Sequence, residues 1–423
     1  MSRPGPVDRI RQTRRLLRSE GYAGVSARLR RRAASRIAPA GTGTLPVPRE
    51  QLVRAAEIAS SGWQLPAGLP AVPGEPLRVA WVCAPPGPGS GGHTTMFRMV
   101  SALERAGHTC VVYLDDRHGG SLERHTQGIR SWWPWVEADI RSVDDGIEDA
   151  HAIFATAWDT AYTVLASPAK GLRFYFVQDV EPAFYPAGSE ALLAEATYRF
   201  GFYGVTAGRW LAELLRRDYG MAADHFDFGC DVDRYALDRS ASAERTGVCF
   251  FARPDTPRRA FGLGVAALEL FAARHPDVDI HLFGDSAGRL PFRATDHGVL
   301  APEELSRLYN RCIAGLVLSA TNVSLVPHEM LATGCVPVVN DAEQNRVVLA
   351  NDQVVYAPPT PFDLADALAA LVERPAGERQ AAAERASASV ETTSWPESGA
   401  AFERVVTSVV RGAGRALSVA GEE

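Results

Sequence analysis

The sequence is nearly without lysine, has few cysteines and contains no long apolar run. Only Lys170 among its 44 basic residues is a lysine, which we attribute to the coding bias of a GC-rich genome. The six cysteines form no CxxC pair, so neither a disulfide framework nor a zinc knuckle is predicted, and a reducing compartment fits better. No stretch approaches the roughly 18 apolar residues that a membrane helix needs, and no secretory signal follows the N-terminus.

The length and composition predict a folded protein of more than one domain. At 423 residues the chain exceeds one compact core. A content of 46% hydrophobic and 22% charged residues is ordinary for a globular protein and excludes a disordered or fibrous chain. The ten histidines show no H-x3-H or HExxH spacing. We therefore expect no metal site and no cofactor.

The first 36 residues differ in charge from the rest of the chain. They hold eleven arginines against Asp8 and Glu20, a local charge of +9, whereas the remaining chain has 33 basic and 48 acidic residues. A basic arm on an acidic body does not fit a nucleic-acid-binding protein. Apolar residues at helical spacing within 1–36 predict an arm that either stays solvated or lies on an anionic membrane surface. The protein is expected in the cytoplasm, with this arm as its candidate contact to the inner membrane.

Strand and helix signals alternate along two stretches of the chain. After a linker at 37–76 rich in proline, glycine and alanine, the apolar run 77–84 is typical of a parallel strand buried on both faces. Further strands of this first series are predicted at 110–114, 152–156, 173–177 and 204–206. The second series predicts strands at 248–251, 279–283, 315–318 and 336–339 and helices at 261–274, 302–311, 325–333 and 361–373.

This alternation predicts an α/β protein with two doubly wound, Rossmann-like parallel sheets that face a central cleft. The expected domains are 77–235 and 236–394, with a last helix at 395–419 that packs back on the first domain. Ligands of open parallel sheets bind outside the carboxyl ends of the strands. Candidate sites are therefore expected in the segments that follow strands.

The first such segment is a glycine-rich turn at 87–92. It satisfies G-x-G-x-x-G between a strand and a helix, and two aspartates follow about twenty residues on, as in a dinucleotide site. Prolines stiffen this turn, and similar turns occur in many α/β folds. One alternative is an NAD-dependent oxidoreductase that uses this turn. The other is a backbone loop, with Gly91, Gly92 and His93, that faces the cleft.

Two further segments follow strands in the second half. Arg253 and Arg258 bracket a tight turn, and the arginine fork suits phosphate because it donates paired hydrogen bonds and stays charged. The polar loop 319–325 runs into a helix whose free N–H groups favour an anion, and Glu329 lies one turn inside it. The alternative without a bound ligand is that Arg253 and Arg258 are ordinary surface arginines and that Glu329 only stabilises its own helix.

The order of these motifs resembles the nucleotide-sugar half of the GT-B glycosyltransferases of the family-4 type. The motifs are Arg253-x4-Arg258, HLFG (281–284), Thr321-x7-Glu329 and ATGCVP (332–337). Within that group, the stretches FVQDVEP (176–182), YPAGSE (185–190), TAG (206–208) and RPxTPR (253–258) look most like the bacterial rhamnosyltransferases represented by WsaF. The similarity covers about 77–395.

The resemblance implies a hexosyltransferase that moves L-rhamnose from dTDP-L-rhamnose to a surface polysaccharide or a lipid-linked glycan, with retention and without a metal. The donor is expected to contact Arg253, Thr256, Arg258, Val299, Leu300, Thr321, Asn322, Ser324, Leu325 and Glu329. The arginines and the N–H groups of 322–325 would stabilise the departing diphosphate. Asp179, Glu181 and His93 are the candidate catalytic residues on the acceptor side.

The chain departs from the family pattern at the first acidic position of E-x7-E, which is Thr321 here. A catalytically inactive, glycan-binding scaffold is therefore a further alternative. Arg258 replaces the family's lysine and keeps its charge. Asp231-x-Asp233 matches the D-x-D metal motif of the other major glycosyltransferase fold, but it lies at the domain junction, so no metal is expected there.

Overall fold

The computed structural model describes most of the chain as two compact units. The described residues are 45–87, 90–240, 245–323, 325–390 and 394–420, with 413–420 described by backbone alone. The basic arm 1–36 therefore lies outside the described residues. The first unit contains the described residues up to Ala207, together with Leu211–Phe226 and the chain from Gly399 onward. The second contains Gly208–Trp210 and Asp227–Ser398.

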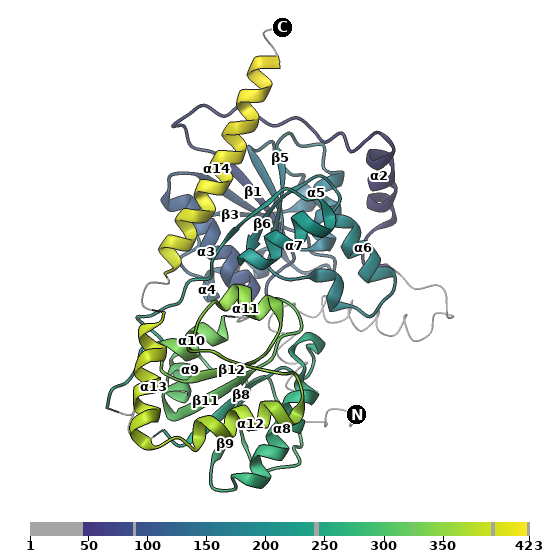
Figure 1. The fold of residues 1–423 in the computed structure, drawn as a ribbon. Helices are drawn as coiled ribbons and strands as arrows, with labels where there is room; N and C mark the ends of the chain where they lie inside the picture. Colours follow the sequence, from purple (N-terminus) through teal and green to yellow (C-terminus); the bar gives the residue numbers. More distant parts are fainter. Residues whose placement is uncertain (1–44, 88–89, 241–244, 324, 391–393, 421–423) are drawn as a thin grey trace. The chain divides into compact units, whose positions relative to one another are not determined.

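The first unit is built on a seven-stranded parallel sheet in the order β3-β2-β1-β4-β5-β6-β7 (Figure 1). Its strands are β1 (Arg78–Cys83), β2 (Thr109–Leu114), β3 (Asp139–Ser142), β4 (Ala152–Ala155), β5 (Leu172–Val177), β6 (Tyr203–Ala207) and β7 (Ala223–Phe226). The central strands β1, β4 and β5 are almost entirely buried because helices cover both faces of the sheet. The strand order reverses between β1 and β4, so the loops after these strands diverge at the carboxyl edge, where ligands of such sheets bind.

Helices of the first unit cover the sheet and support its carboxyl edge. They are α2 (Arg49–Ser60), α3 (Gly91–Arg105), α4 (Leu122–Trp132), α5 (Trp158–Ala166), α6 (Ser189–Thr197), α7 (Arg209–Tyr219) and α14 (Trp395–Ala420), with the short 3-10 helices η1 (Val143–Asp145) and η2 (Glu181–Phe184). The chain leaves α3 through Gly107, whose φ of 89° lies in the left-handed region that favours glycine.

The last helix, α14, contributes a residue to the core of the first unit. Phe402 is fully buried, and its ring centroid lies 5.7 Å from that of Trp81 and 5.7 Å from that of Phe154. Phe176 and Phe226 lie 5.8 Å from it on the same face. The helix therefore completes an aromatic cluster whose other members come from β1, β4, β5 and β7.

The second unit contains a six-stranded parallel sheet in the order β10-β9-β8-β11-β12-β13. Its strands are β8 (Gly247–Ala252), β9 (Asp279–Gly284), β10 (Thr295–Asp296), β11 (Cys312–Val317), β12 (Val336–Asn340) and β13 (Val355–Ala357). Strands β8 and β11 are neighbours at the centre of this sheet. Their carboxyl ends therefore lie side by side, and the loops that leave them meet.

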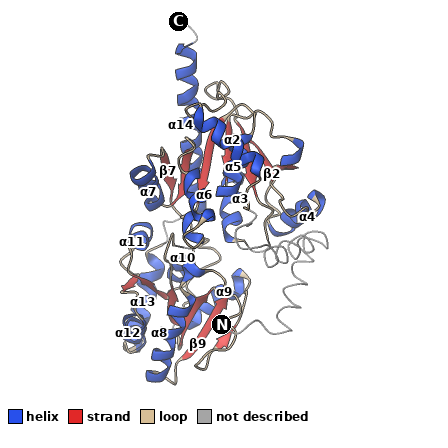
Figure 2. Ribbon diagram, turned by 90° about the vertical axis from the view of Figure 1, so that its right-hand side faces the viewer, coloured by secondary structure: helices blue, strands red, loops and turns tan. Residues whose placement is uncertain are grey.

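Helices pack on both faces of the second sheet (Figures 1 and 2). They are η4 (Pro257–Arg259), α8 (Phe261–Arg274), α9 (Pro302–Arg311), α10 (Val326–Ala332), α11 (Glu343–Leu349), α12 (Pro361–Val372) and α13 (Ala376–Ala388). Helix α8 approaches the sheet closely, because a Cβ at Gly264 would lie 2.2 Å from the ring of Phe250. Among the described residues, no helix is long and apolar enough to cross a membrane.

The second unit begins earlier than the boundary at 235 and 236 that the sequence predicted. The division follows Phe226, and 227–235 belong to the second unit. Tyr235 is buried there, with its ring centroid 6.2 Å from that of Tyr309. This aromatic contact ties the segment to the second core.

Candidate functional site

The turn after β8 is folded by its own backbone. The Thr256 N–H donates to the Arg253 carbonyl over 3.0 Å, and the Arg259 N–H donates to the Thr256 carbonyl over 2.9 Å. Ala260 then adopts a left-handed φ of 46° and starts α8. The half-buried guanidinium of Arg253 lies over the ring of Phe251, 6.0 Å from its centroid. Among the described residues Arg253 has no acidic partner, so its charge is uncompensated within the turn.

The structure joins this turn to the loop that follows β11. The Ala320 N–H donates to the Arg258 carbonyl over 2.8 Å. Arg259 donates through Nη1 to the Ser319 hydroxyl (2.9 Å) and to the Asn322 carbonyl (3.1 Å). The two segments predicted to bind a diphosphate are therefore neighbours. Arg259, which was not among the predicted site residues, links the turn after β8 to the loop after β11 by these hydrogen bonds.

Asn340, at the end of β12, holds the same loop from the other side. Its Oδ1 accepts from the Ser319 N–H (2.8 Å), and its Nδ2 donates to the Ser319 carbonyl (2.9 Å). Asn345 in turn donates to the Asn340 carbonyl over 2.8 Å. These asparagines are buried and were missed at the sequence level, because no local pattern relates them to a loop some twenty residues earlier.

The predicted donor residues of the loop are mostly buried. Thr321 and Asn322 are 4% and 1% exposed, and Leu325 is half-buried beside the start of α10. The Thr321 hydroxyl oxygen is buried and has no hydrogen-bond partner among the described residues. Ser324 lies outside the described residues. An unsatisfied buried hydroxyl costs free energy, so this loop favours a partner for Thr321 that the described chain does not supply.

Glu329 lies in α10 beside two buried tyrosines. The Tyr309 hydroxyl donates to Glu329 Oε2 over 3.4 Å. Burial, together with the nearby Glu329 carboxylate, raises the pKa of both Tyr309 and Tyr235 well above the ordinary value. Leu300 packs against the hydrophobic core that contains both tyrosines, whereas Val299 is 57% exposed. Glu329 is therefore held at the edge of this buried core by Tyr309.

In the first unit, His93 holds the glycine-rich loop after β1. Its Nε2 lies 3.0 Å from the Ala84 carbonyl, which can only accept, so Nε2 carries the proton and Nδ1 accepts from the Ser90 hydroxyl over 2.8 Å. Burial lowers the pKa of His93, which keeps the ring neutral. Gln178 Nε2 donates to the Gly92 carbonyl over 3.0 Å, so the loop after β5 touches the first turn of α3. Gly91 starts α3 beside them.

Asp179 and Glu181 follow β5, as predicted, but their carboxylates differ in setting. Asp179 is buried as well, at 8% exposed, and its Oδ1 accepts from the Val180 N–H over 2.8 Å within the loop. Glu181 Oε2 accepts from the Trp158 N–H (2.6 Å), and Oε1 accepts from the Tyr175 hydroxyl (2.8 Å). Both oxygens of Glu181 are thus engaged inside the unit. This geometry favours a role in positioning the start of α5 over contact with a sugar.

The buried Glu181 carboxyl predicts a pH dependence of folding stability. Burial raises its pKa from 4.5 to about 8. Between these values the folded chain keeps a proton that the unfolded chain has released, so the free energy of unfolding falls as pH rises from about 4.5 to 8. We expect Glu181→Gln to flatten this slope in urea unfolding at pH 5, 6.5 and 8. Parallel slopes in the wild type and the variant would contradict the assignment.

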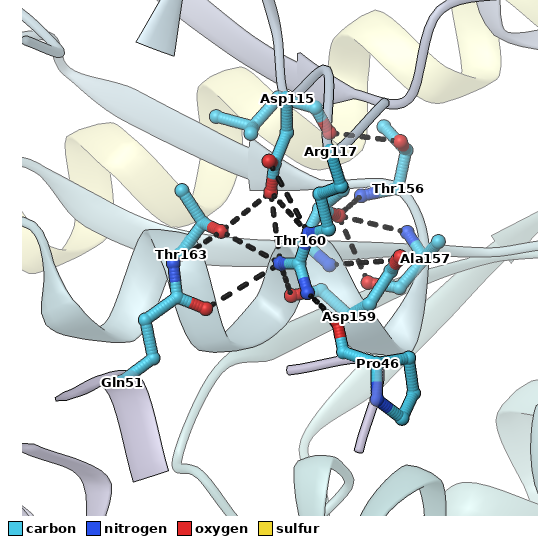
Figure 3. Close-up of polar contacts among 10 residues, drawn as sticks. Pro46, Gln51, Asp115, Arg117, Thr156, Ala157, Asp159, Thr160 and Thr163 are labelled. Carbon is cyan, nitrogen blue, oxygen red and sulfur yellow. Dashed lines mark hydrogen bonds and ion pairs between the residues drawn. The ribbon is translucent and has the colours of Figure 1, made fainter. Parts of the chain in front are cut away.

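A polar network ties the segment before α2 to the carboxyl edge of the first sheet (Figure 3). Arg117 forms an ion pair with Asp115 (2.9 Å) and donates to the Pro46 carbonyl (2.6 Å). It also donates to the Asp159 carbonyl (2.9 Å) and to the Thr163 hydroxyl (3.2 Å). The network fixes α2 against α5 and stiffens the edge on which the acceptor-side residues lie.

Other features of the described residues lie away from these loops or carry no site. No group of three or more His, Cys, Asp and Glu side chains in the described ranges is arranged to hold a metal ion. Within the D-x-D motif, Asp231 faces Arg234 at 3.8 Å. A cavity of about 290 Å³ lies at the opposite, amino end of the second sheet, lined by Val336, Val355 and Arg374 among others.

Comparison with known proteins identifies the second unit. Residues 246–369 match the family described as WsaF, C-terminal domain. The predicted resemblance to WsaF-like GT-B glycosyltransferases is thereby confirmed. The matched WsaF region contains the arginine turn, the loop after β11 and Glu329.

Two curated relatives match about half of the chain. The O-antigen biosynthesis protein RfbC of Myxococcus xanthus is 37% identical over 214 residues, which is 49% of this chain and 17% of RfbC. The phosphatidyl-myo-inositol mannosyltransferase of Mycolicibacterium smegmatis is 30% identical over 230 residues, 51% of this chain and 58% of the relative. The chain thus spans less than two thirds of the length of either relative.

The fold agrees with solved structures. Anabaena HepE in complex with UDP-glucose superposes with a TM-score of 0.59 at 13% identity, over 79% of this chain and 100% of HepE. The two parallel sheets with flanking helices are those of the GT-B glycosyltransferases, which confirms the predicted fold class.

Proposed function

We propose that this protein is a glycosyltransferase of glycan biosynthesis that transfers L-rhamnose from dTDP-L-rhamnose to a saccharide acceptor. The observation that carries the proposal is the backbone bond between Ala320 and Arg258, because it sets two half-buried arginines beside a polar loop at one edge of a parallel sheet. The relatives support the class of reaction, since RfbC is named for O-antigen biosynthesis and the mycobacterial relative for mannosyl transfer.

The arginine turn would act on the leaving group. Negative charge grows on the diphosphate as the glycosidic bond breaks, and fixed positive charge stabilises that transition state more than the ground state. Arg253 has no acidic partner in the described part of the chain, so its charge is available to an anion. The helix α10 has only seven residues, so its dipole is small and the arginines supply most of the stabilisation.

The remaining donor contacts would fix the nucleotide. Glu329 accepts from Tyr309 over 3.4 Å, and its carboxylate can accept further hydrogen bonds from ribose hydroxyls. Thr321 replaces a carboxylate with a buried hydroxyl, which adds no negative charge beside the donor. Val299 and Leu300 offer apolar and backbone contacts to the base. HepE binds UDP-glucose, which supports a nucleotide sugar as the donor class.

On the acceptor side, we assign the contact nearest the reacting sugar to Asp179. His93 would shape the loop of Gly91 and Gly92, because both of its ring nitrogens are engaged. The transfer is proposed to proceed with retention and without a metal, the leaving phosphate taking the acceptor proton. The basic arm 1–36 would bring the enzyme to the inner face of the plasma membrane, where lipid-linked acceptors are found.

Binding and transfer measured in parallel test this function. We expect dTDP to raise the melting temperature more than UDP, GDP or NAD, and dTDP-L-rhamnose to be consumed in the presence of EDTA when an acceptor glycan is added. A larger shift with UDP would correct the donor. Binding of dTDP without transfer would favour an inactive scaffold, and a shift with NAD alone would favour an oxidoreductase.

A further inference from the structure

Two exposed tryptophans lie close together in sequence at the end of α4. Trp132 and Trp135 are 54% and 40% exposed, and the buried Trp133 and the exposed Pro134 lie between them in the sequence. We call Trp132, Pro134 and Trp135 the tryptophan ridge. Apolar side chains that are contiguous at the surface mark interaction sites more often than single ones, and tryptophan gives much contact area for little loss of conformational entropy.

The ridge is held on a rigid turn. The Trp133 side chain is 4% exposed, and its Nε1 donates to the Thr94 hydroxyl over 2.9 Å. Its ring lies 5.0 Å from that of Phe97. Arg130 closes the turn by donating to the carbonyls of Val136 and Ala138. The backbone that presents the exposed rings is therefore already fixed before any ligand binds, which lowers the entropic cost of binding.

The ridge lies beside the acceptor-side loop of the first unit. Thr94 is in the first turn of α3, directly after the loop that leaves the carboxyl end of β1. The ring of Phe97, which packs on Trp133, is 6.4 Å from that of His93. Substrates of parallel sheets approach at this carboxyl edge. Trp133, which lies between the two exposed tryptophans in the sequence, thus anchors their turn to the helix that follows the loop to which we assign the acceptor.

The charge around the ridge favours a neutral ligand over an anionic membrane. The charged side chains of 122–139 are Glu123, Arg124, Arg130, Glu137 and Asp139, a net charge of −1 with His125 neutral. The guanidinium of Arg130 is turned onto backbone carbonyls. Adsorption to anionic lipid needs clustered basic residues. The C–H faces of pyranose rings, in contrast, pack on indole without needing charge.

We propose that the tryptophan ridge is a second acceptor subsite, which binds sugar units of the growing glycan that lie beyond the unit carrying the reacting hydroxyl. This inference rests on the proposed function and specifies its acceptor as an oligosaccharide. Stacking on two exposed indoles of one anchored turn would bind a chain of sugars, while a single sugar could occupy only the reacting position. Affinity for the acceptor therefore depends on acceptor length.

The test uses the full chain and a ladder of neutral oligosaccharides of one to five rhamnose, mannose or glucose units. In the wild type we expect affinity, measured by calorimetry, to rise with length. The double variant Trp132→Ala/Trp135→Ala should lose tenfold or more for the longest acceptors, and the loss should grow with length. Trp132→Phe/Trp135→Phe should recover most of the affinity. Leu192→Ala, which removes another exposed apolar side chain of this unit, is the matched control.

Equal affinities of the double variant and the wild type for every length would overturn the subsite, as would a wild type that binds all lengths alike. Flotation with vesicles containing phosphatidylglycerol tests whether the ridge binds a membrane instead. If the double variant lost vesicle binding but kept its oligosaccharide binding, the subsite would also be overturned. Titration with dTDP in the same samples reports on the proposed function alone. The ridge variants should leave the dTDP affinity unchanged.

Discussion

Replacing Arg258 with alanine is expected to lower kcat/KM for the nucleotide sugar by about 10²-fold, the usual cost of losing one donor to a developing negative charge. The substitution removes the guanidinium, but the carbonyl that accepts from the Ala320 N–H is main chain and remains. The turn should therefore keep its fold. Arg258→Lys should recover part of the activity, because lysine keeps the charge and loses the paired hydrogen bonds.

Arg274→Ala is the matched control for Arg258→Ala. Arg274 lies at the end of α8, its guanidinium is solvent-accessible, and it pairs with Asp366 at the surface. Such pairs contribute little, so we expect wild-type kinetics. The kinetics should be measured with dTDP-L-rhamnose, and nucleotide affinity by calorimetry with dTDP. If Arg258→Ala bound dTDP as tightly as the wild type, the proposal that the arginine turn binds the donor diphosphate would be wrong.

The second large effect is expected at Arg245, which is buried in the second unit. Its Nη1 donates to the carbonyls of Tyr309 (3.0 Å) and Cys312 (2.8 Å), and its Nη2 donates to the Thr333 carbonyl. Arg245→Ala removes these three buried hydrogen bonds. Each costs about 1–3 kcal/mol, so the free energy of unfolding should fall by about 4 kcal/mol.

Urea unfolding and hydrogen exchange measure this loss. Thr333 ends α10, the helix that carries Glu329, so exchange should rise at 329–335 before the sheet exchanges. Arg311→Ala, an exposed arginine next to Cys312, should stay within about 0.5 kcal/mol of the wild type. Unfolding of Arg245→Ala at the wild-type urea concentration would show that the carbonyls find other donors.

Strong periodicity in the sequence predicted the central elements well. The helices α8 and α9 have the predicted bounds. Strand β1 begins one residue inside the predicted run, and it could be predicted because its apolar residues are buried on both faces. The edge strand β3 was not predicted, since Asp139–Ser142 is polar and pairs on one side only. An edge strand lacks the continuous apolar run that marks a buried parallel strand.

Site prediction was limited by contacts between residues far apart in the chain. Residue type and position after a strand predicted Arg258 as a donor contact, and its carbonyl accepts from the Ala320 N–H in the loop after β11. The same reasoning could not distinguish Arg259, which binds that loop, from its neighbour. Nor could it detect that Tyr175 and Trp158 would enclose Glu181. Spacing along the chain identifies the edge of a sheet, whereas the direction of a side chain there depends on tertiary packing.

The position of Phe402 has a consequence for biosynthesis. The ribosome releases the strands that supply Trp81, Phe154, Phe176 and Phe226 long before it makes α14. Phe402 is therefore absent from this aromatic cluster while the whole second unit is translated. A nascent chain that stops at Ser398 would expose them to solvent and to chaperones. Folding of the first unit is therefore expected to finish only after translation of α14, and premature termination anywhere in the second unit should yield an aggregating product.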